Sequence, residues 1–206
     1  DAIGERWAIF FDGEKETVVA GKDELDIKDC AFASAGLDVR VGDSTLAGTL
    51  GEGAASGRAG ALSWDLEFSG GQAPLLFLPE RFYSAGFPKA KALVPAPLCA
   101  WRGPIQVAGE TYDLDGWPGS QNHNWGSKHT DQYAWGQVAG FDDAPDAFLE
   151  CSTARVKLGP LWTPWLSLVV LRLDGREHRL NGLLRAVRAR GRYGDFDWRF
   201  STRQQD

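Results

Sequence analysis

The sequence predicts a mostly β protein built of antiparallel strands, and three observations support this fold class. Short apolar runs are separated by turn signals, and two of the turns are Asp-Gly pairs, which favour tight hairpins. Apolar and polar residues alternate along Phe196–Phe200, as they do in a half-buried strand. Helical spacing is weak and is confined to Leu180–Val187, where a glycine interrupts it.

Three hairpins are expected, each formed by two strands that follow one another in the chain. They are Trp7–Phe11 with Glu14–Val19, Tyr133–Phe141 with Ala147–Leu158, and Leu168–Leu173 with Arg176–Leu180. The first and third turn on Asp12-Gly13 and Asp174-Gly175, because Asp-Gly readily supplies the positive φ angles of a type I′ turn. The second brackets an Asp-Asp-Ala-Pro-Asp turn.

A faint internal repeat favours two related β lobes. Gly57–Leu66 matches Gly191–Phe200 in its order of Gly, Arg, Gly, apolar, Trp and apolar residues. The segment Pro74–Pro104 holds six of the ten prolines, which cannot donate to a ladder, so we expect an extended connector packed between the lobes. The expected division is a first, incomplete β lobe at residues 1–87 and a second lobe at residues 88–206.

The composition is that of a globular protein and argues against several classes of function. Hydrophobic residues make up 43% of the chain and charged residues 24%, and nine Trp suit either a filled β core or an aromatic-lined cavity. A net charge of −6 argues against nucleic acid as a partner. No apolar run approaches the ~20 residues of a membrane-spanning helix, so no integral membrane segment is expected.

The cysteines bear on the cellular compartment. Cys30, Cys99 and Cys151 are an odd number without CxxC spacing, which predicts neither a disulfide framework nor a zinc ribbon and favours a reducing environment. We therefore expect a cytoplasmic protein, with attachment to the periphery of a membrane as an alternative. The chain begins with Asp and contains no Met, so we expect a fragment or a processed form. The sequence gives no indication of the oligomeric state.

The densest group of polar and aromatic residues lies at Gly116–Gln137. These 22 residues hold two of the three His and three of the nine Trp. The segment contains Asn-His-Asn-Trp-Gly at Asn122–Gly126, and a second Trp-Gly pair follows at Trp135-Gly136. A glycine-containing approach precedes it, at Gly103–Gly109 and then at Tyr112–Gly116.

This order resembles the core motif of the hydroxyneurosporene synthases (carotenoid 1,2-hydratases) and the related AttH-like proteins, over roughly residues 75–175. The resemblance implies antiparallel lipocalin-like (calycin-type) barrel lobes with a hydrophobic cavity. It also implies cofactor-free chemistry, in which a carboxylic acid protonates an alkene, aromatic rings shelter the cation, and water or an internal nucleophile captures it. Such chemistry needs an acid whose pKa an apolar setting raises, and aromatic faces beside the cation.

The resemblance assigns roles to particular residues. His123 and Trp125 match its His-x-Trp element, and Phe148-Leu149-Glu150 is the nearby candidate for its aromatic-x-acid element. This chain has Phe148 where the hydratases carry Tyr and Glu150 where they carry Asp, which places hydratase activity itself in doubt. The expected catalytic residues are Glu150 as general acid and His123 as proton shuttle or orienting group. The expected ligand-binding residues are Asn122, Asn124, Trp125, Tyr133, Trp135, Phe148, Trp162 and Trp165.

Each candidate also has a purely structural interpretation. His123 could be a hydrogen-bonded residue of an inner face, and Glu150 a surface charge if its face of the strand points outward. Trp162 and Trp165 could plug a core or the space between the lobes, instead of forming a ligand-contacting lip or a sugar-stacking platform as in lectins. The separation of His123 and His129 matches no common zinc pattern, so no metal is expected.

Three classes of function therefore remain open. The first is a cofactor-independent hydratase, cyclase or isomerase acting on a hydrophobic small molecule such as an isoprenoid, a lipid or a polyketide-like chain. It predicts Glu150 buried close to His123 or to a ligand. The second is a non-catalytic lipid carrier or stress-linked lipid-binding protein, which predicts a cavity without a buried acid. The third is a carbohydrate-binding module, which predicts Trp162 and Trp165 exposed and coplanar.

Overall fold

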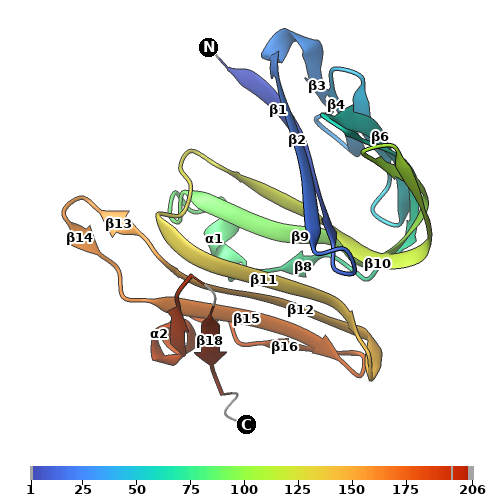
Figure 1. Cartoon of the computed structure of the whole chain (residues 1–206). Coiled ribbons are helices and arrows are strands. Elements are labelled where there is room, and N and C mark those ends of the chain that lie inside the picture. Colours follow the sequence, from blue (N-terminus) through green and yellow to red (C-terminus); the bar gives the residue numbers. More distant parts are fainter. Residues whose placement is uncertain (1, 196, 204–206) are drawn as a thin grey trace. The chain divides into compact units, whose positions relative to one another are not determined.

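The computed structural model describes residues 2–195 and 197–203. Strands make up 66% of the chain and helices 6%, which confirms the predicted fold class. Two compact units are present, and each combines separate stretches of the chain (Figure 1). Unit 1 consists of Asp1–Gln72 and Cys99–Gly119, and unit 2 of Ala73–Leu98 and Ser120–Asp206.

This division does not coincide with the contiguous lobes expected at residues 1–87 and 88–206. The reason is one long hairpin, formed by β9 (Ala90–Val107, 18 residues) and β10 (Glu110–Gly126, 17 residues). The end of the hairpin that carries the turn, Cys99–Gly119, belongs to unit 1. The beginning of β9 and the end of β10 belong to unit 2. A single cut along the sequence cannot separate units that share such strands.

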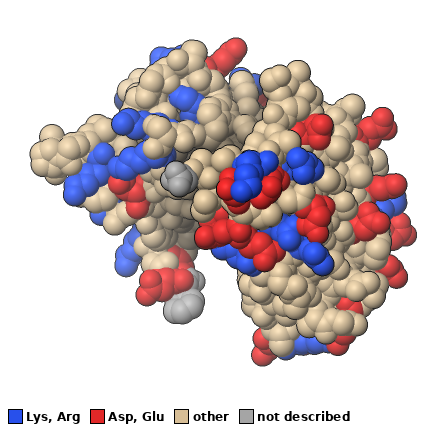
Figure 2. Space-filling view, turned by 90° about the horizontal axis from the view of Figure 1, so that it is seen from above, with Lys and Arg blue, Asp and Glu red and all other residues tan. Residues whose placement is uncertain are grey.

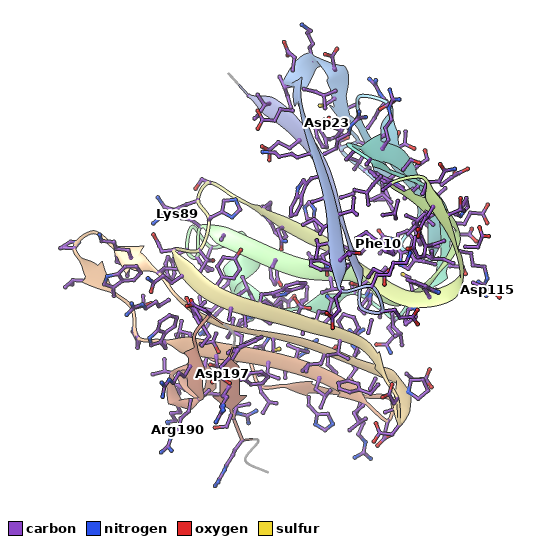
Figure 3. The ribbon with its side chains drawn as sticks, viewed as in Figure 1. Phe10, Asp23, Lys89, Asp115, Arg190 and Asp197 are labelled. Atoms are coloured by element: carbon purple, nitrogen blue, oxygen red, sulfur yellow. The ribbon has the colours of Figure 1, made fainter. Side chains whose placement is uncertain are left out.

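Unit 1 is a meander of short antiparallel strands. Its elements are β1 (Ile3–Asp12), β2 (Thr17–Asp26), η1 (Ile27–Asp29), β3 (Cys30–Phe32), β4 (Leu37–Val41), β5 (Ser44–Gly48), β6 (Glu52–Ala59) and β7 (Leu62–Gly70). Strands β3 to β7 pair in chain order, and β9 and β10 continue that sheet after β7. The Phe10 ring of β1, labelled in Figure 3, contacts the Tyr112 ring of β10 at 4.7 Å between centroids.

The first predicted hairpin is confirmed as β1–β2, but its predicted turn is wrong. Asp12 pairs with Thr17, so the loop has four residues instead of turning on Asp12-Gly13. The Asp12 carboxylate accepts hydrogen bonds from the backbone N–H groups of Glu14 and Lys15, and Glu16 takes the positive φ of 52°. The aspartate thus stabilises a wider turn through its side chain.

The proline-rich segment is not the extended connector that we expected. It contains β8 (Leu75–Leu76), α1 (Arg81–Ser84) and most of β9. Pro95 and Pro97 lie between the residues of β9 that pair with β8 and those that pair with β7. Pro104 follows Gly103 in a gap of the β7 ladder. The prolines therefore occupy positions where these neighbouring strands form no ladder pair, which proline tolerates.

The main sheet of unit 2 contains the other two predicted hairpins. Its strands, in the order β11-β12-β15-β16, are β11 (Gln132–Phe141), β12 (Ala144–Arg155), β15 (Leu166–Leu173) and β16 (Arg176–Arg179). Phe141 pairs with Ala144, which leaves a tight turn of two aspartates. Asp174 and Gly175 both have positive φ, as predicted for the third hairpin.

The C-terminal segment covers one face of this sheet. It comprises α2 (Leu183–Arg188), where weak helical spacing was noted, β17 (Arg190–Tyr193) and β18 (Trp198–Ser201). The Trp198 indole donates a hydrogen bond to the buried Thr153 hydroxyl at 3.0 Å. Both copies of the sequence repeat form hairpins, β6–β7 and β17–β18. Phe196, the first residue of the predicted alternating strand, lies outside the described residues.

The opposite face of the sheet packs against β8 and β9. The core consists of fully or almost fully buried side chains: Leu75, Phe77, Val94, Phe148 and Val170. Within the described part of the chain, no helix is both long and apolar enough to cross a bilayer. Further along the Phe148 face of β12, the apolar core gives way to an acid.

Candidate functional site

Glu150 is a buried acid on the inner face of unit 2. It belongs to β12, which is paired on both sides, with Gln137 of β11 opposite it on one side and Val170 of β15 on the other. Only 3% of Glu150 is exposed. Because side chains alternate along a strand, Glu150 shares its face with Phe148, and that face points inward. The structure therefore places Glu150 where the general-acid hypothesis requires it, while its role stays a prediction.

Two neutral groups hold the carboxylate. The Trp135 indole N–H donates to Oε1 at 2.6 Å, and the Gln137 amide donates to Oε2 at 2.7 Å. Both donors lie on β11, where Gln137 pairs with Glu150 and Trp135 pairs with Ser152. Residues two apart on a strand share a face, so both donors lie on the same face of the sheet as Glu150. Each carboxylate oxygen thus has one defined donor, which fixes the orientation of the acid.

The hydrogen bonds continue from Gln137 to the last part of β10. The Gln137 amide nitrogen also donates to Asn122 Oδ1 at 2.9 Å, and the Ser120 hydroxyl donates to Gln137 Oε1. Gln137 is therefore held on both sides of its amide group. We call Glu150, Trp135, Gln137, Asn122 and Ser120 the acid network.

The environment favours the protonated form of Glu150 more than water does. Burial raises the pKa of this carboxyl, and the bonds from Trp135 and Gln137 offset only part of that effect. Among the described residues, no cation contributes to stabilising the carboxylate. The charge of Glu150 also reaches the opposite side of the strand, where it adds to the burial that raises the pKa of Cys151 to about 12.

Trp135 connects the buried acid to solvent, and Tyr133 adds exposed aromatic surface further along the same strand face. Trp135 is 50% exposed although its indole nitrogen bonds to Glu150, and Tyr133, two residues away on the same face, is 54% exposed. The ring surface beside the acid is therefore accessible. An apolar molecule resting on Trp135 would lie against the residue that holds the carboxylate.

His123 and Trp125 take part in a stack of three rings. The His123 and Trp125 centroids are 5.0 Å apart, and those of Trp125 and Tyr83 are 5.8 Å apart, with interplanar angles of 26° and 27°. Trp125 remains 37% exposed. Figure 3 labels Lys89 at the open end of the β9–β10 hairpin, where β9 begins and β10 ends. There Gly126 lies directly against the Lys89 carbonyl. A side chain at Gly126 would collide with that carbonyl, so the glycine permits the close approach.

The expected catalytic pair of His123 and Glu150 is not formed. His123 is exposed and its described contact is the Trp125 ring, whereas the described hydrogen bonds of Glu150 come from Trp135 and Gln137. The physical reason is strand alternation, because Asn122 bonds to Gln137 and its neighbour His123 projects from the other side of β10. His123 is the sequence neighbour of Asn122 in the acid network, but its side chain makes no described hydrogen bond to Glu150.

Tyr83 is a member of the ring stack that the sequence did not single out. Its hydroxyl donates to the Ala92 carbonyl at 2.7 Å and accepts from the Leu78 backbone N–H at 3.1 Å, which ties α1 to β9. Burial raises the pKa of Tyr83, and the negative charge of Glu150 adds to the shift.

Two other predicted ligand-binding residues lie in different settings. Phe148 has no exposed surface and belongs to the apolar core, because β8 and β9 cover the sheet at its level. The structure thus gives Phe148 a packing role, and its expected contact with a ligand stays a prediction. Asn124 is exposed at the end of β10.

Trp162 and Trp165 both contact the same cation. The Arg155 guanidinium lies over both rings, 4.5 Å from the Trp162 centroid and 4.6 Å from that of Trp165. Trp165 also meets the Tyr193 ring edge-on. Stacking on a sugar requires a free indole face, and Arg155 already lies over one face of each ring.

Other possible sites are less developed. No three His, Cys, Asp or Glu side chains gather in a metal-holding group within residues 2–195 and 197–203. One hollow of about 510 Å³ is lined by residues of α2, β17 and β18 together with Trp165, and another of about the same volume lies beside Ile3 and Ile27. Neither hollow includes Glu150.

Sequence reasoning missed three residues of this region: Ser120, Gln137 and Tyr83. Gln137 alternates with Tyr133 and Trp135, so period-two spacing along the predicted strand already placed it on their face. Ser120 and Tyr83 gave no comparable signal. They reach the site through the path of β10 and through a one-turn helix that was not predicted.

The antiparallel sheets described above define a lipocalin-like β fold. No protein-family model matches the chain. A protein of Nitrosomonas europaea, whose crystal structure is provisionally assigned to AttH, superposes with a TM-score of 0.65 at 16% identity. The match covers 85% of this chain and 55% of that one. The predicted AttH-like fold is therefore confirmed, and the resemblance to hydroxyneurosporene synthases in particular stays a prediction.

Sequence comparison finds two uncharacterised proteins of Mycobacterium tuberculosis, from strains CDC 1551 / Oshkosh and ATCC 25618 / H37Rv. Each is 26% identical to this chain over 148 residues, which is 72% of this chain and 44% of the relative. The chain thus spans about half the length of the proteins that it matches.

Proposed function

We propose that unit 2 binds a hydrophobic small molecule, such as an isoprenoid, a lipid or a polyketide-like chain, on the aromatic surface beside Glu150. We further propose that Glu150 acts as a general acid in a cofactor-independent hydration, cyclisation or isomerisation. The observation that carries the proposal is a buried carboxyl group, held by two neutral donors, next to half-exposed aromatic rings.

The setting of Glu150 suits proton donation to an alkene. Burial without a compensating cation raises its pKa, so a larger fraction of the group carries a proton near neutral pH than in water. Trp135 and Gln137 both donate hydrogen bonds to the carboxyl oxygens of Glu150. These two bonds therefore persist after the carboxyl group has given up its proton. The acid is therefore oriented in both protonation states.

The proposed step is balanced without a cofactor. The Glu150 proton forms a C–H bond with one alkene carbon, and the π electrons of the alkene supply that bond. The adjacent carbon becomes a cation, which the faces of Trp135 and Tyr133 stabilise by cation–π attraction. Water then bonds to the cation and releases a proton to the Glu150 carboxylate, which gives hydration. Attack by an internal alkene followed by proton loss gives cyclisation, and proton loss alone gives isomerisation.

The test uses heavy water and an acyclic isoprenoid, geranylgeraniol, as the defined probe beside a lipid extract. The carboxyl proton exchanges with solvent, so turnover in heavy water should place one deuterium on a carbon of the product, as seen by mass spectrometry. Glu150→Gln should abolish this label, because a carboxamide does not donate a proton at neutral pH. Equal labelling by the variant and the unaltered protein would overturn the general-acid role.

The alternatives receive different support from the structure. A carrier using the same rings predicts no buried acid, so Glu150 weighs against it. Retention of geranylgeraniol by the protein without any labelled product would nevertheless favour the carrier. For a carbohydrate-binding module built on Trp162 and Trp165, Arg155 already lies over one face of each ring, so only the opposite face of each indole is left to stack on a sugar.

A further inference from the structure

A short hairpin of unit 2 presents large apolar side chains to solvent. It consists of β13 (Lys157–Leu158) and β14 (Leu161–Trp162), joined through Gly159 and Pro160. Leu158 is 52% exposed, Leu161 is 70% exposed, and the two are directly paired. Figure 1 shows that the hairpin extends beyond the end of the four-stranded sheet of unit 2. We call Leu158–Leu161 the apolar tip.

The base of the hairpin is firmly held, so the tip is a built feature of the fold. The backbones of Val156 and Thr163 are joined by a hydrogen bond of 2.9 Å, and the Thr163 hydroxyl accepts a second bond from the Val156 N–H. The Asp131 carboxylate accepts from the Lys157 backbone N–H at 2.9 Å. A stable base that leaves two leucines in water has a cost, which burial against another apolar phase would offset.

Aromatic and positive side chains surround the tip. Trp162, 41% exposed, pairs with Lys157, whose ammonium lies 5.9 Å from the indole centroid. The Arg155 guanidinium also lies over the Trp162 ring, 4.5 Å from its centroid. Among the described residues, no carboxylate forms an ion pair with Arg155 or Lys157. In a chain of net charge −6, this is a locally positive region, and Figure 2 shows Lys and Arg gathered beside the projecting tip at the left.

We propose that the β13–β14 hairpin docks on an anionic lipid bilayer. Leu158 and Leu161 would enter the boundary of the acyl chains, Trp162 would lie at the level of the headgroups, and Lys157 would meet lipid phosphates. The order of the side chains from tip to base, apolar, then aromatic and cationic, matches the order of layers from the bilayer interior outward. This inference does not depend on catalysis by Glu150.

A protein partner fits the tip less well. A stable protein interface buries about 800 Å² on each partner, whereas the tip is a turn of four residues. A convex tip of this size gains more from a fluid apolar phase, which needs no complementary surface. The unpaired positive charges also select a surface that is both apolar and negative, and a bilayer with anionic headgroups has both properties.

The experiment measures binding of the full chain to vesicles by co-sedimentation. One set of vesicles contains phosphatidylcholine alone and the other contains phosphatidylcholine mixed with phosphatidylglycerol. We expect the unaltered protein to bind the mixed vesicles and to be released by high salt. Replacing Leu158 and Leu161 by serine should weaken binding about tenfold for each leucine lost. Lys157→Glu reverses one charge and should weaken binding to the mixed vesicles about thirtyfold.

The matched control is Leu184→Ser. Leu184 lies on α2 and is 74% exposed, so its replacement removes a comparable exposed leucine elsewhere in unit 2 and should leave binding unchanged. Circular dichroism and thermal melting show whether each variant is folded. No binding by the unaltered protein, or equal losses in the Leu184 control, would overturn the proposal. So would sedimentation equilibrium showing that the leucine replacements abolish self-association and leave vesicle binding intact.

Discussion

Replacing Glu150 by glutamine should change how the stability of the protein depends on pH. The substitution keeps the size of the side chain and removes its charge at every pH. In the unaltered protein, the folded state raises the pKa of Glu150 because the carboxylate is buried without a cation. The stabilising contribution of the protonated acid is therefore present below the ordinary glutamate pKa and is lost as the pH rises through the raised value.

Two contributions set the size of the effect. Each unit by which the folded state raises the pKa of Glu150 removes about 1.4 kcal/mol of stability as the pH rises, and glutamine has no such loss. Glutamine also offers one acceptor where the carboxylate offers two, so either Trp135 or Gln137 loses its acceptor. A buried donor without a partner costs about 1–3 kcal/mol, independently of pH. The variant should thus be less stable at acid pH, by an amount that shrinks as the pH rises.

Urea unfolding followed by tryptophan fluorescence, at pH values from roughly 4 to 8, measures the difference. Glu14→Gln is the matched control for loss of one carboxylate, since Glu14 lies exposed in the β1–β2 loop. The difference between the Glu150 variant and the unaltered protein should narrow with pH. A constant difference across the whole range would refute the inference that burial controls the titration of this acid.

Three further substitutions test the packing within the two units, two of them in unit 2 and one in unit 1, each by urea unfolding. Thr153→Val should cost about 2–4 kcal/mol, because the Trp198 indole and a buried serine hydroxyl both lose a partner, and Thr153→Ser should restore most of it. Phe148→Ala should cost about 3–5 kcal/mol as a core cavity, and an effect on ligand binding without loss of stability would contradict the packing role. Gly21→Ala should destabilise unit 1 by more than about 1 kcal/mol, since its Cβ would lie 2.1 Å from the Ala59 carbonyl oxygen, and an unchanged midpoint would show that β2 moves aside freely.

Local patterns predicted much of the site. Period-two alternation put Tyr133 and Trp135 on one strand face, and the same rule placed Glu150 with Phe148 on one face of the next strand. Alternation alone left open whether that face points inward or outward. The face points inward because β8 and β9 cover its Phe148 end and bury it.

Other parts of the site depend on contacts that local sequence does not encode. The ring stack needs α1 beside the end of β10, and the acid network needs Ser120 and Asn122 to meet Gln137 across two different strands. His123 was expected at the acid because of its place in the motif, but strand alternation turns it toward Trp125. A motif gives the order of residues, whereas the side that each one faces depends on which strands are paired.

The sequence by itself determined the β class, the three hairpins and the Asp174-Gly175 turn, because strand alternation and turn conformations depend on a few neighbouring residues. Tertiary structure decided the rest. It made the proline-rich segment a strand, since the ladder gaps that tolerate proline are set by distant partners. It also joined separate stretches of chain into each unit and enclosed Glu150 among neutral donors. The burial that makes Glu150 an unusual acid arises from residues far from it in the sequence, and only the folded chain brings them together.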